Sequence, residues 1–284
     1  ADDFTTSASS IQEKEVTDKL ELDARNVLCY MASNYLSANA QKTGFMMIRA
    51  TRKTHIASVK IAFVQVLEQE HHSILGLEVN NSLSWANHVY DKLLPSVRFR
   101  VGSLRRLSYH VPRSFLGEIA SAIIGSKIRY GVGIYGPARI TETEPISGLS
   151  KDLQIALNDA MRIVLNCRRS DHVSVKELVK VTGIQSINHM SAQSKIMLAW
   201  QAINLSGSPL RNELISQRDA STFNSRSKAR GDLCATAVTS KGQRNFPDTT
   251  VRIWNCTPPA LRNVLKKSSA KSSCKEFINS LPLI

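Results

Sequence analysis

Two aspartates stand side by side at the start of the sequence, as Asp2 and Asp3. Carboxylate oxygens are the ligands that Mg²⁺ prefers, so two carboxylates on one tight turn suit a divalent cation. Adjacent aspartates are also typical of solvent-exposed turns, because Asp favours turns and is seldom buried without a partner. Two such side chains cannot complete the coordination shells of two metal ions. Chemistry that uses two metals would therefore require a further acidic ligand.

The chain as a whole is strongly basic. Its 284 residues include 37 Lys and Arg against 23 Asp and Glu, which gives a formal net charge of +14. Such an excess favours a polyanionic partner, with nucleic acid a commoner choice than an acidic membrane surface. No apolar run approaches the length of about 18 residues that crosses a bilayer. The sequence therefore predicts a nucleic-acid partner and no membrane.

The positive charge is concentrated between residues 98 and 139, where Glu118 is the single acidic residue. Arg98 and Arg105 are seven positions apart, so they share one face of a helix. Aromatic residues make up 6% of the chain, which favours contacts to the phosphate backbone over extensive base stacking. A solvated helix face is the ordinary alternative for a run of charge. We expect nucleic-acid binding through Arg98, Arg105, Arg106 and Arg129, with further contacts from the other arginines up to Arg139 and from the basic residues that begin at Lys195.

Other side chains that bind metals are poorly spaced for the purpose. His71 and His72 are adjacent but have no third ligand at a usable spacing, so we expect them at the surface. Trp85 and His88 suit stacking on a nucleic acid, although packing against their own sheet is the favoured interpretation. The five cysteines lack the paired spacing of zinc or redox sites, which favours a reducing intracellular compartment.

Hydrophobic periodicity predicts an amphipathic helix over residues 11–34 and short strands within 43–79. Helical spacing then dominates. The first predicted helix carries Leu94, Val97, Val101, Leu104 and Leu107, and the second carries Phe115, Ile119, Ile123 and Ile128. Later helices are expected over 151–166, after a capping box formed by Ser174 and Glu177, and over 191–204. Residues 216–250 are polar and basic, and too long for an ordinary connection, so we expect them to be mobile or ordered by a partner.

These patterns predict an α+β fold with short antiparallel strands and a helix at the amino end, followed by a mainly α-helical remainder. The expected boundaries lie near residues 90 and 215. Because the first residue is not methionine, we also expect this chain to be part of a longer polypeptide.

Several stretches, taken in order, resemble the reverse transcriptase of non-LTR retrotransposons of the jockey-like kind. Ala-Asp-Asp in residues 1–3 is similar to the second half of the catalytic hairpin. The palm segment after that hairpin is matched by SNYLSANAQKTGFM, and the primer-grip turn by LGLEVNNSLSWANHV. The stretches LRRLSYHVP, SKIRYGVGIYG and AMRIVLN are similar to the thumb and the segment after it, and TVRIWNCTPPALRN to the tail.

The resemblance implies an RNA-directed DNA polymerase, a nucleotidyltransferase of a mobile element that uses Mg²⁺ and acts on an RNA template and a DNA primer. Residues 1–90 would be the carboxy-terminal part of the palm, 91–215 the thumb and connector, and 216–284 a basic loop and tail. Asp2 and Asp3 would bind the metal, and Lys42 would protonate the departing pyrophosphate. The backbone at Leu75 and Gly76 would touch the primer. The nucleus and the cytoplasm are the implied locations, within a ribonucleoprotein.

This sequence departs from the family pattern in what it lacks. The aromatic residue before Ala1, the fingers and the palm strand with another metal-binding aspartate are all absent from it. They would be upstream partners in the same polyprotein, and we expect the fragment to be inactive alone. The alternative is a degenerate or co-opted descendant that only binds nucleic acid.

Overall fold

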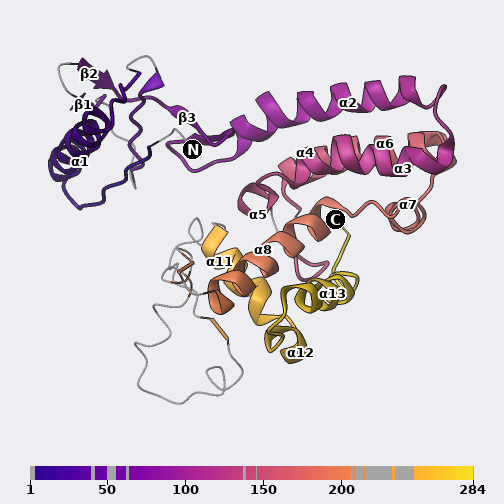
Figure 1. Cartoon of the computed structure of the whole chain (residues 1–284). Coiled ribbons are helices and arrows are strands. Elements are labelled where there is room, and N and C mark those ends of the chain that lie inside the picture. The colour runs from indigo at the N-terminus through magenta and orange to yellow at the C-terminus, as the bar shows by residue number, and fades with distance from the viewer. Residues whose placement is uncertain are drawn as a thin grey trace. The chain divides into compact units, whose positions relative to one another are not determined.

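The structure is a computed structural model that describes residues 4–39, 42–49, 56–61, 64–136, 139–144, 146–205, 207–208, 211, 214, 232–233 and 246–283. The chain divides into two compact units, Ala1–His88 and Val89–Ile284, and each is treated by itself. The described elements are mainly helical, with two small antiparallel hairpins in the first unit (Figure 1). The predicted α+β class is thus confirmed, with helices dominant.

The first unit combines one long helix with the two hairpins. Helix α1 (Glu13–Ser33) has acidic side chains in its first turn, which suits the positive end of the helix dipole. Strand β1 (Ser58–Ile61) pairs with β2 (Val64–Leu67), and α1 packs on β1. The buried core is small: Phe45, Met47, Ala57 and Val59, against which Val16, Leu20, Ile61 and Val66 pack.

The second hairpin of this unit joins β3 (His71–Ile74) to β4 (Leu77–Asn80), with His71 opposite Asn80 and Ile74 opposite Leu77. The two residues between the strands, Leu75 and Gly76, have φ of 49° and 79°. Positive φ at both central positions is the geometry of the tight hairpin turn that matches the twist of its strands. Gly76 adopts it freely, whereas a leucine does so rarely.

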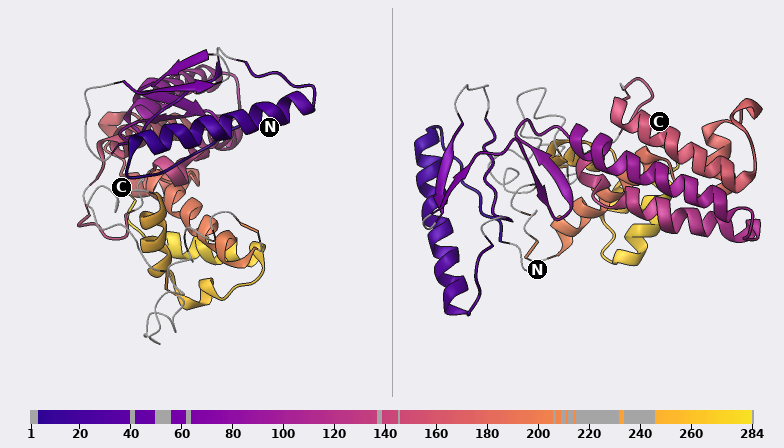
Figure 2. Two further views of the ribbon diagram at one scale, coloured as in Figure 1. Left: turned by 90° about the vertical axis from the view of Figure 1, so that its left-hand side faces the viewer. Right: turned by 90° about the horizontal axis from the view of Figure 1, so that it is seen from above.

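The second unit begins with a bundle of long helices. After the π-helical η2 (His88–Leu93) comes α2 (Leu94–Leu107), and the chain then reverses into α3 (Arg113–Ala120), η3 (Ser121–Gly125) and α4 (Ser126–Arg129). Helix α6 (Gly148–Leu165) packs against α2, α3 and α7 (Val175–Thr182), as the views in Figure 2 allow the reader to follow. Ser147 and Ser174 cap α6 and α7 by accepting bonds from the amides of Ser150 and Glu177. The Ser174 half of the predicted capping box is thus present.

Helix α8 (Ile187–Asn204) is the centre of the rest of this unit. It packs against α5 (Val132–Tyr135), α11 (Phe246–Asn255) and α13 (Lys267–Ile278), and the short α12 (Pro259–Arg262) packs on α13. Because neighbours surround it, α8 buries residues on nearly all sides. Trp200, Trp254, Leu261 and Ile278 are among the members of its core.

Two local predictions differ from the structure. The buried side of the helix after Arg113 consists of Leu116, Ala120, Ile124 and Ile128. Only Ile128 belongs to the predicted series; the other three follow a predicted residue by one position, and Phe115 is 55% exposed. Both apolar series have helical spacing, so only the packing against α6 selects between them. The second difference is that residues 246–250, expected in the polar connection, form the first half of α11. None of the helices that the structure describes is long and apolar enough to cross a membrane.

Candidate nucleic-acid interface

Helix α2 exposes three of the four predicted nucleic-acid-binding arginines to solvent. Leu94, Val97, Val101 and Leu104 are buried at three- and four-residue steps, so the opposite face of the helix must point to solvent. Arg98, Arg105 and Arg106 are all exposed. At about 100° per residue, Arg106 lies opposite the buried stripe, whereas Arg98 and Arg105 lie together on one flank of it. With a rise of about 1.5 Å per residue, Arg98 and Arg105 are about 10 Å apart along the helix axis. This distance covers roughly three phosphates at the 3.4 Å rise of one DNA strand.

Few protein groups compete for these arginines. Within the described part of the chain, the side chains of Arg98 and Arg105 make no ion pair, and Arg106 Nη2 donates to the hydroxyl of Ser103 at 3.2 Å. Helix α2 contains no acidic residue between Leu94 and Leu107. The guanidinium groups are therefore available to an external anion, for which Arg has a suitable planar fork of donors.

Phe99, the residue after Arg98, was not predicted as part of this surface. Its side chain is 72% exposed. Because successive helical residues are about 100° apart, Phe99 lies about 180° from the middle of the buried stripe. The sequence already contains the pattern that predicts this exposure, because the spacing of Leu94, Val97, Val101 and Leu104 defines the outward face of the helix. An exposed ring beside arginines offers a surface on which an unpaired base can stack.

Arg129 lies on a different helix from the other three predicted residues. Arg100 Nη1 donates to the carbonyl of Ile123 at 3.1 Å, which fixes α2 against the segment that returns alongside it. This register places Arg129 toward the beginning of α2, the end nearer to Arg98. Arg129 is exposed, and its Nη1 is 3.4 Å from the hydroxyl of Ser121. Arg100 itself is occupied by its bond to the carbonyl, so it serves to hold the helices together.

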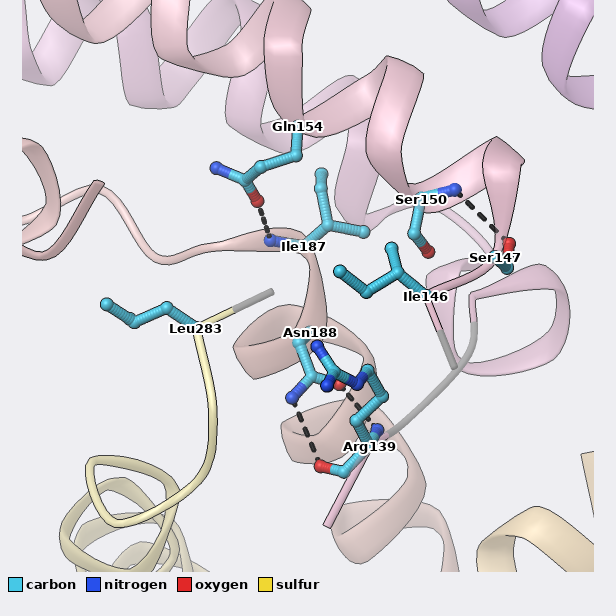
Figure 3. Close-up of a pocket in the computed structure, with 8 residues that line it drawn as sticks. All are labelled: Arg139, Ile146, Ser147, Ser150, Gln154, Ile187, Asn188 and Leu283. Carbon is cyan, nitrogen blue, oxygen red and sulfur yellow. Dashed lines mark hydrogen bonds between the residues drawn. The ribbon is translucent and has the colours of Figure 1, made fainter. Parts of the chain in front are cut away.

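Arg139 was a further candidate, and the structure contradicts that prediction because the residue is only 8% exposed. Its amide donates to Asn188 Oδ1 at 2.7 Å, Asn188 Nδ2 donates back to its carbonyl at 3.1 Å, and its Nη2 donates to the carbonyl of Glu142. Figure 3 shows it beside Asn188 in a small pocket that is also lined by Ile146, Ile187 and Leu283. Arg139 therefore holds loop 139–144 to α8 and does not face a nucleic acid.

Lys195 is the second basic residue for which the prediction is wrong. It lies in the middle of α8 and is 1% exposed, so it cannot contact a phosphate backbone. Its Nζ donates to the carbonyl of Gly133 and lies 5.5 Å from the centre of the Phe246 ring. Desolvation lowers the pKa of this amine to about 7. This burial has no signal in the sequence, because α5 and α11, which pack on α8, create it.

The residues assigned to catalysis belong to the first unit. Asp2 and Asp3 lie outside the described residues, so the fit of a metal ion to them has no structural test. Lys42 is exposed, and its amide donates to the carbonyl of Asn39 at 3.1 Å. Leu75 and Gly76 are the two central residues of the β3–β4 turn, with Leu75 67% exposed.

Glu13 and Glu68, near the core of this unit, form ion pairs with Arg49. Arg49 donates from Nη2 to Glu13 at 2.7 Å and to the second carboxylate oxygen of Glu68 at 2.8 Å. The hydrogen bond from Arg49 lowers the pKa of Glu68, and the two carboxylates raise the pKa of Arg49. Both carboxylates are thus used structurally. The described residues contain no group of three or more side chains suited to hold a metal ion.

His71 and His88 of this unit have structural partners. His71 Nδ1 lies 3.0 Å from Glu78 Oε1, and its side chain is 60% exposed, as expected of a surface residue. His88 is buried: its Nδ1 lies 3.3 Å from the amide of Glu78, and its ring meets Trp85 edge to face at 6.4 Å. The packing interpretation of His88 is therefore confirmed.

Comparisons with protein-family models, with curated protein sequences and with solved structures found no match for this chain. The family resemblance consequently depends on the sequence motifs alone.

Proposed function

We propose that this chain is part of the RNA-directed DNA polymerase of a jockey-like non-LTR retrotransposon and that its helical unit binds the template and primer. The observation that carries the binding proposal is the composition of α2, with Arg98, Arg105 and Arg106 exposed and no acidic residue on the helix. Exposed guanidinium groups on a rigid helix bind phosphates without reading base sequence. That property suits an enzyme that must copy any template.

The first unit supports the polymerase part of the proposal through the β3–β4 turn. The two residues that the motif assigns to the primer grip, Leu75 and Gly76, form a tight turn whose backbone is accessible. In the proposed enzyme, the metal ions would hold the attacking and leaving oxygens of the nucleotide when Asp2, Asp3 and a further carboxylate bind them. This chain would supply two of those ligands, the turn and, at Lys42, a proton donor.

The binding proposal predicts a change in salt dependence when the arginines are removed. The variant with Arg98→Ala, Arg105→Ala and Arg106→Ala should bind an RNA–DNA hybrid more weakly, and the slope of log affinity against log salt should fall by up to about 2.7, since each phosphate contact contributes about 0.9. Fluorescence anisotropy between 50 and 300 mM salt measures both quantities.

A matched control removes the same amount of charge from another helix. Lys14, Lys19 and Arg25 are exposed on α1 and lie outside the predicted contact residues, so their replacement by alanine should change the slope much less. Equal losses in the two triple variants would show that net charge alone drives binding and would contradict an interface on α2.

The polymerase proposal predicts that the purified 284-residue chain does not extend a primer. Two adjacent carboxylates cannot complete two metal coordination shells, and the described residues add no metal-binding cluster. A primer-extension assay with Mg²⁺ and a labelled primer on an RNA template measures this. Detectable extension by this chain alone would overturn the prediction, whereas binding without extension is the expected result.

A further inference from the structure

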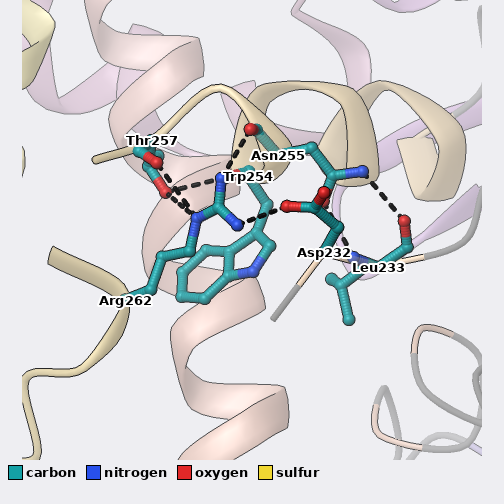
Figure 4. A network of polar contacts seen from close by, with 6 residues as sticks. All are labelled: Asp232, Leu233, Trp254, Asn255, Thr257 and Arg262. Atoms are coloured by element: carbon teal, nitrogen blue, oxygen red, sulfur yellow. Dashed lines mark hydrogen bonds and ion pairs between the residues drawn. The ribbon is translucent and has the colours of Figure 1, made fainter. Parts of the chain in front are cut away.

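The basic stretch between α8 and α11 is held at the dipeptide Asp232–Leu233. These two residues are described in the structure, and they make hydrogen bonds and an ion pair to Asn255 of α11 and Arg262 of α12 (Figure 4). Three different features of the dipeptide are contacted: its backbone, its carboxylate and its aliphatic side chain.

The side chain of Asn255 holds the backbone of the dipeptide. The amide of Leu233 donates to Asn255 Oδ1 at 2.8 Å, and Asn255 Nδ2 donates to the carbonyl of Leu233 at 2.8 Å. This two-point pairing reproduces what a neighbouring β-strand offers to an extended peptide. It is the main-chain component of many peptide-recognition sites.

The carboxylate of Asp232 is recognised by Arg262, whose Nη1 is 2.5 Å from Asp232 Oδ1. The two side chains are 8% and 12% exposed, so the pair is well shielded from water. A shielded arginine that lost its carboxylate would bear an uncompensated charge, which penalises any neutral residue in the place of Asp232.

Arg262 is held in position without the help of Asp232. Its Nε donates to the carbonyl and the hydroxyl of Thr257 at 3.0 and 3.2 Å, and its Nη2 donates to the carbonyl of Asn255 at 2.5 Å. These acceptors belong to the end of α11 and the loop after it, where carbonyl groups favour a cation. The arginine would therefore keep its orientation if the dipeptide left. Such preorganisation reduces the entropy cost of binding.

Leu233 supplies the apolar contact. Its side chain is 3% exposed and belongs to the same buried cluster as Ile253, Trp254 and Leu261. Asp232 and Leu233 thus place opposite chemistry on neighbouring positions, and a reversed dipeptide would bury a carboxylate among apolar groups.

We propose that α11 and α12 form a binding site for an extended acidic-leucine dipeptide, which this chain occupies with its own Asp232–Leu233 and which accepts the same dipeptide from a separate peptide. The ligand class is a peptide with Asp followed by Leu. Asn255 binds its backbone, Arg262 its carboxylate and the α8–α11 core its leucine. This site is independent of the proposed nucleic-acid interface.

The test uses the full chain with its own ligand disabled by Asp232→Ala and Leu233→Ala. A fluorescent peptide with the sequence ARGDLSATA, which copies residues 229–237 with serine in place of Cys234, is titrated against it. We expect saturable anisotropy with the double variant and at least tenfold weaker binding of the control peptide ARGLDSATA. The unchanged chain should bind the peptide more weakly, because its own dipeptide competes at an effective concentration near the millimolar range.

A third variant adds Asn255→Asp to the double variant. It keeps an acceptor for the peptide amide but removes the donor to the peptide carbonyl, so binding should be lost. Equal binding of the two peptides, or no binding by a double variant with unchanged circular dichroism, would overturn the proposal. If the double variant does not fold, the peptide in excess is added to the unchanged chain. Faster hydrogen exchange at Leu233 would then support the site, and unchanged exchange would contradict it.

Discussion

Replacing Gly136 by alanine should destabilise the helical unit by about 1 to 3 kcal/mol, the usual cost of forcing extra atoms into a packed site. Gly136 directly follows α5, and a Cβ atom there would lie 2.5 Å from the carbonyl oxygen of Val132 and 3.0 Å from the hydroxyl of Ser191. The first of these atoms belongs to the backbone, so α5 must move to make room. The shift would also disturb the bond that Ser191 Oγ donates to the carbonyl of Gly136 at 2.8 Å.

Gly102→Ala is the matched control, with an effect of opposite sign. No atom lies within 4 Å of a Cβ built on Gly102, which is in the middle of α2. Alanine in an open helical position is favoured over glycine by roughly 0.5 to 1 kcal/mol, because it restricts the unfolded chain. Urea unfolding followed by circular dichroism measures both free energies. Similar effects from the two substitutions would contradict the packing of α5 against α8.

The second large effect concerns the pH dependence of stability. Lys195 should make the free energy of unfolding depend strongly on pH above pH 7. Its pKa is about 7 in the folded protein, below the ordinary value of 10.5, because burial disfavours the charged amine. Between these two pH values the unfolded chain binds more protons than the folded chain at this site. The free energy of unfolding must therefore rise with pH in this window, by up to about 1.4 kcal/mol per pH unit.

The measurement compares the unchanged chain with Lys195→Met from pH 7.5 to pH 9. The unchanged chain should gain roughly 2 kcal/mol relative to the variant over this range. Burial lowers the pKa of His189 and raises the pKa of Cys274 to about 12, but both groups are present in the two proteins and cancel in the difference. Lys271→Met, at an exposed position of α13, is the control and should leave the slope unchanged. Parallel curves for Lys195→Met and the unchanged chain would rule out the burial of a titrating amine.

Both effects arise where α5, α8 and α11 meet. Lys195 bonds to the carbonyl of Gly133, and Gly136 is bonded by Ser191, so α8 holds α5 through one polar contact near each end. This junction belongs to the scaffold of the helical unit. Substitutions at Gly136 or Lys195 should therefore change the stability of this unit and leave the exposed arginines of α2 in place.

The sequence alone determined the local elements of this protein and the outward face of one helix. The spacing of Leu94, Val97, Val101 and Leu104 predicted α2, and the seven-residue interval from Arg98 to Arg105 placed both arginines on one side. The predicted strand-rich region was also correct. Such features are encoded by periodicity along a single segment, and this is why they can be recognised without knowledge of the neighbours.

Only the tertiary structure decided which of two apolar stripes, or which cation, is buried. Phe115 and Leu116 begin series that differ by about 100° around one helix, and the packing on α6 chose the second. Lys195 and Arg139 are buried because other helices and loops cover them. The residues next to them in the sequence do not indicate this cover. The ion pair between Arg262 and Asp232 likewise joins residues that are 30 positions apart. Burial depends on contacts between distant segments, whereas sequence spacing describes each segment by itself.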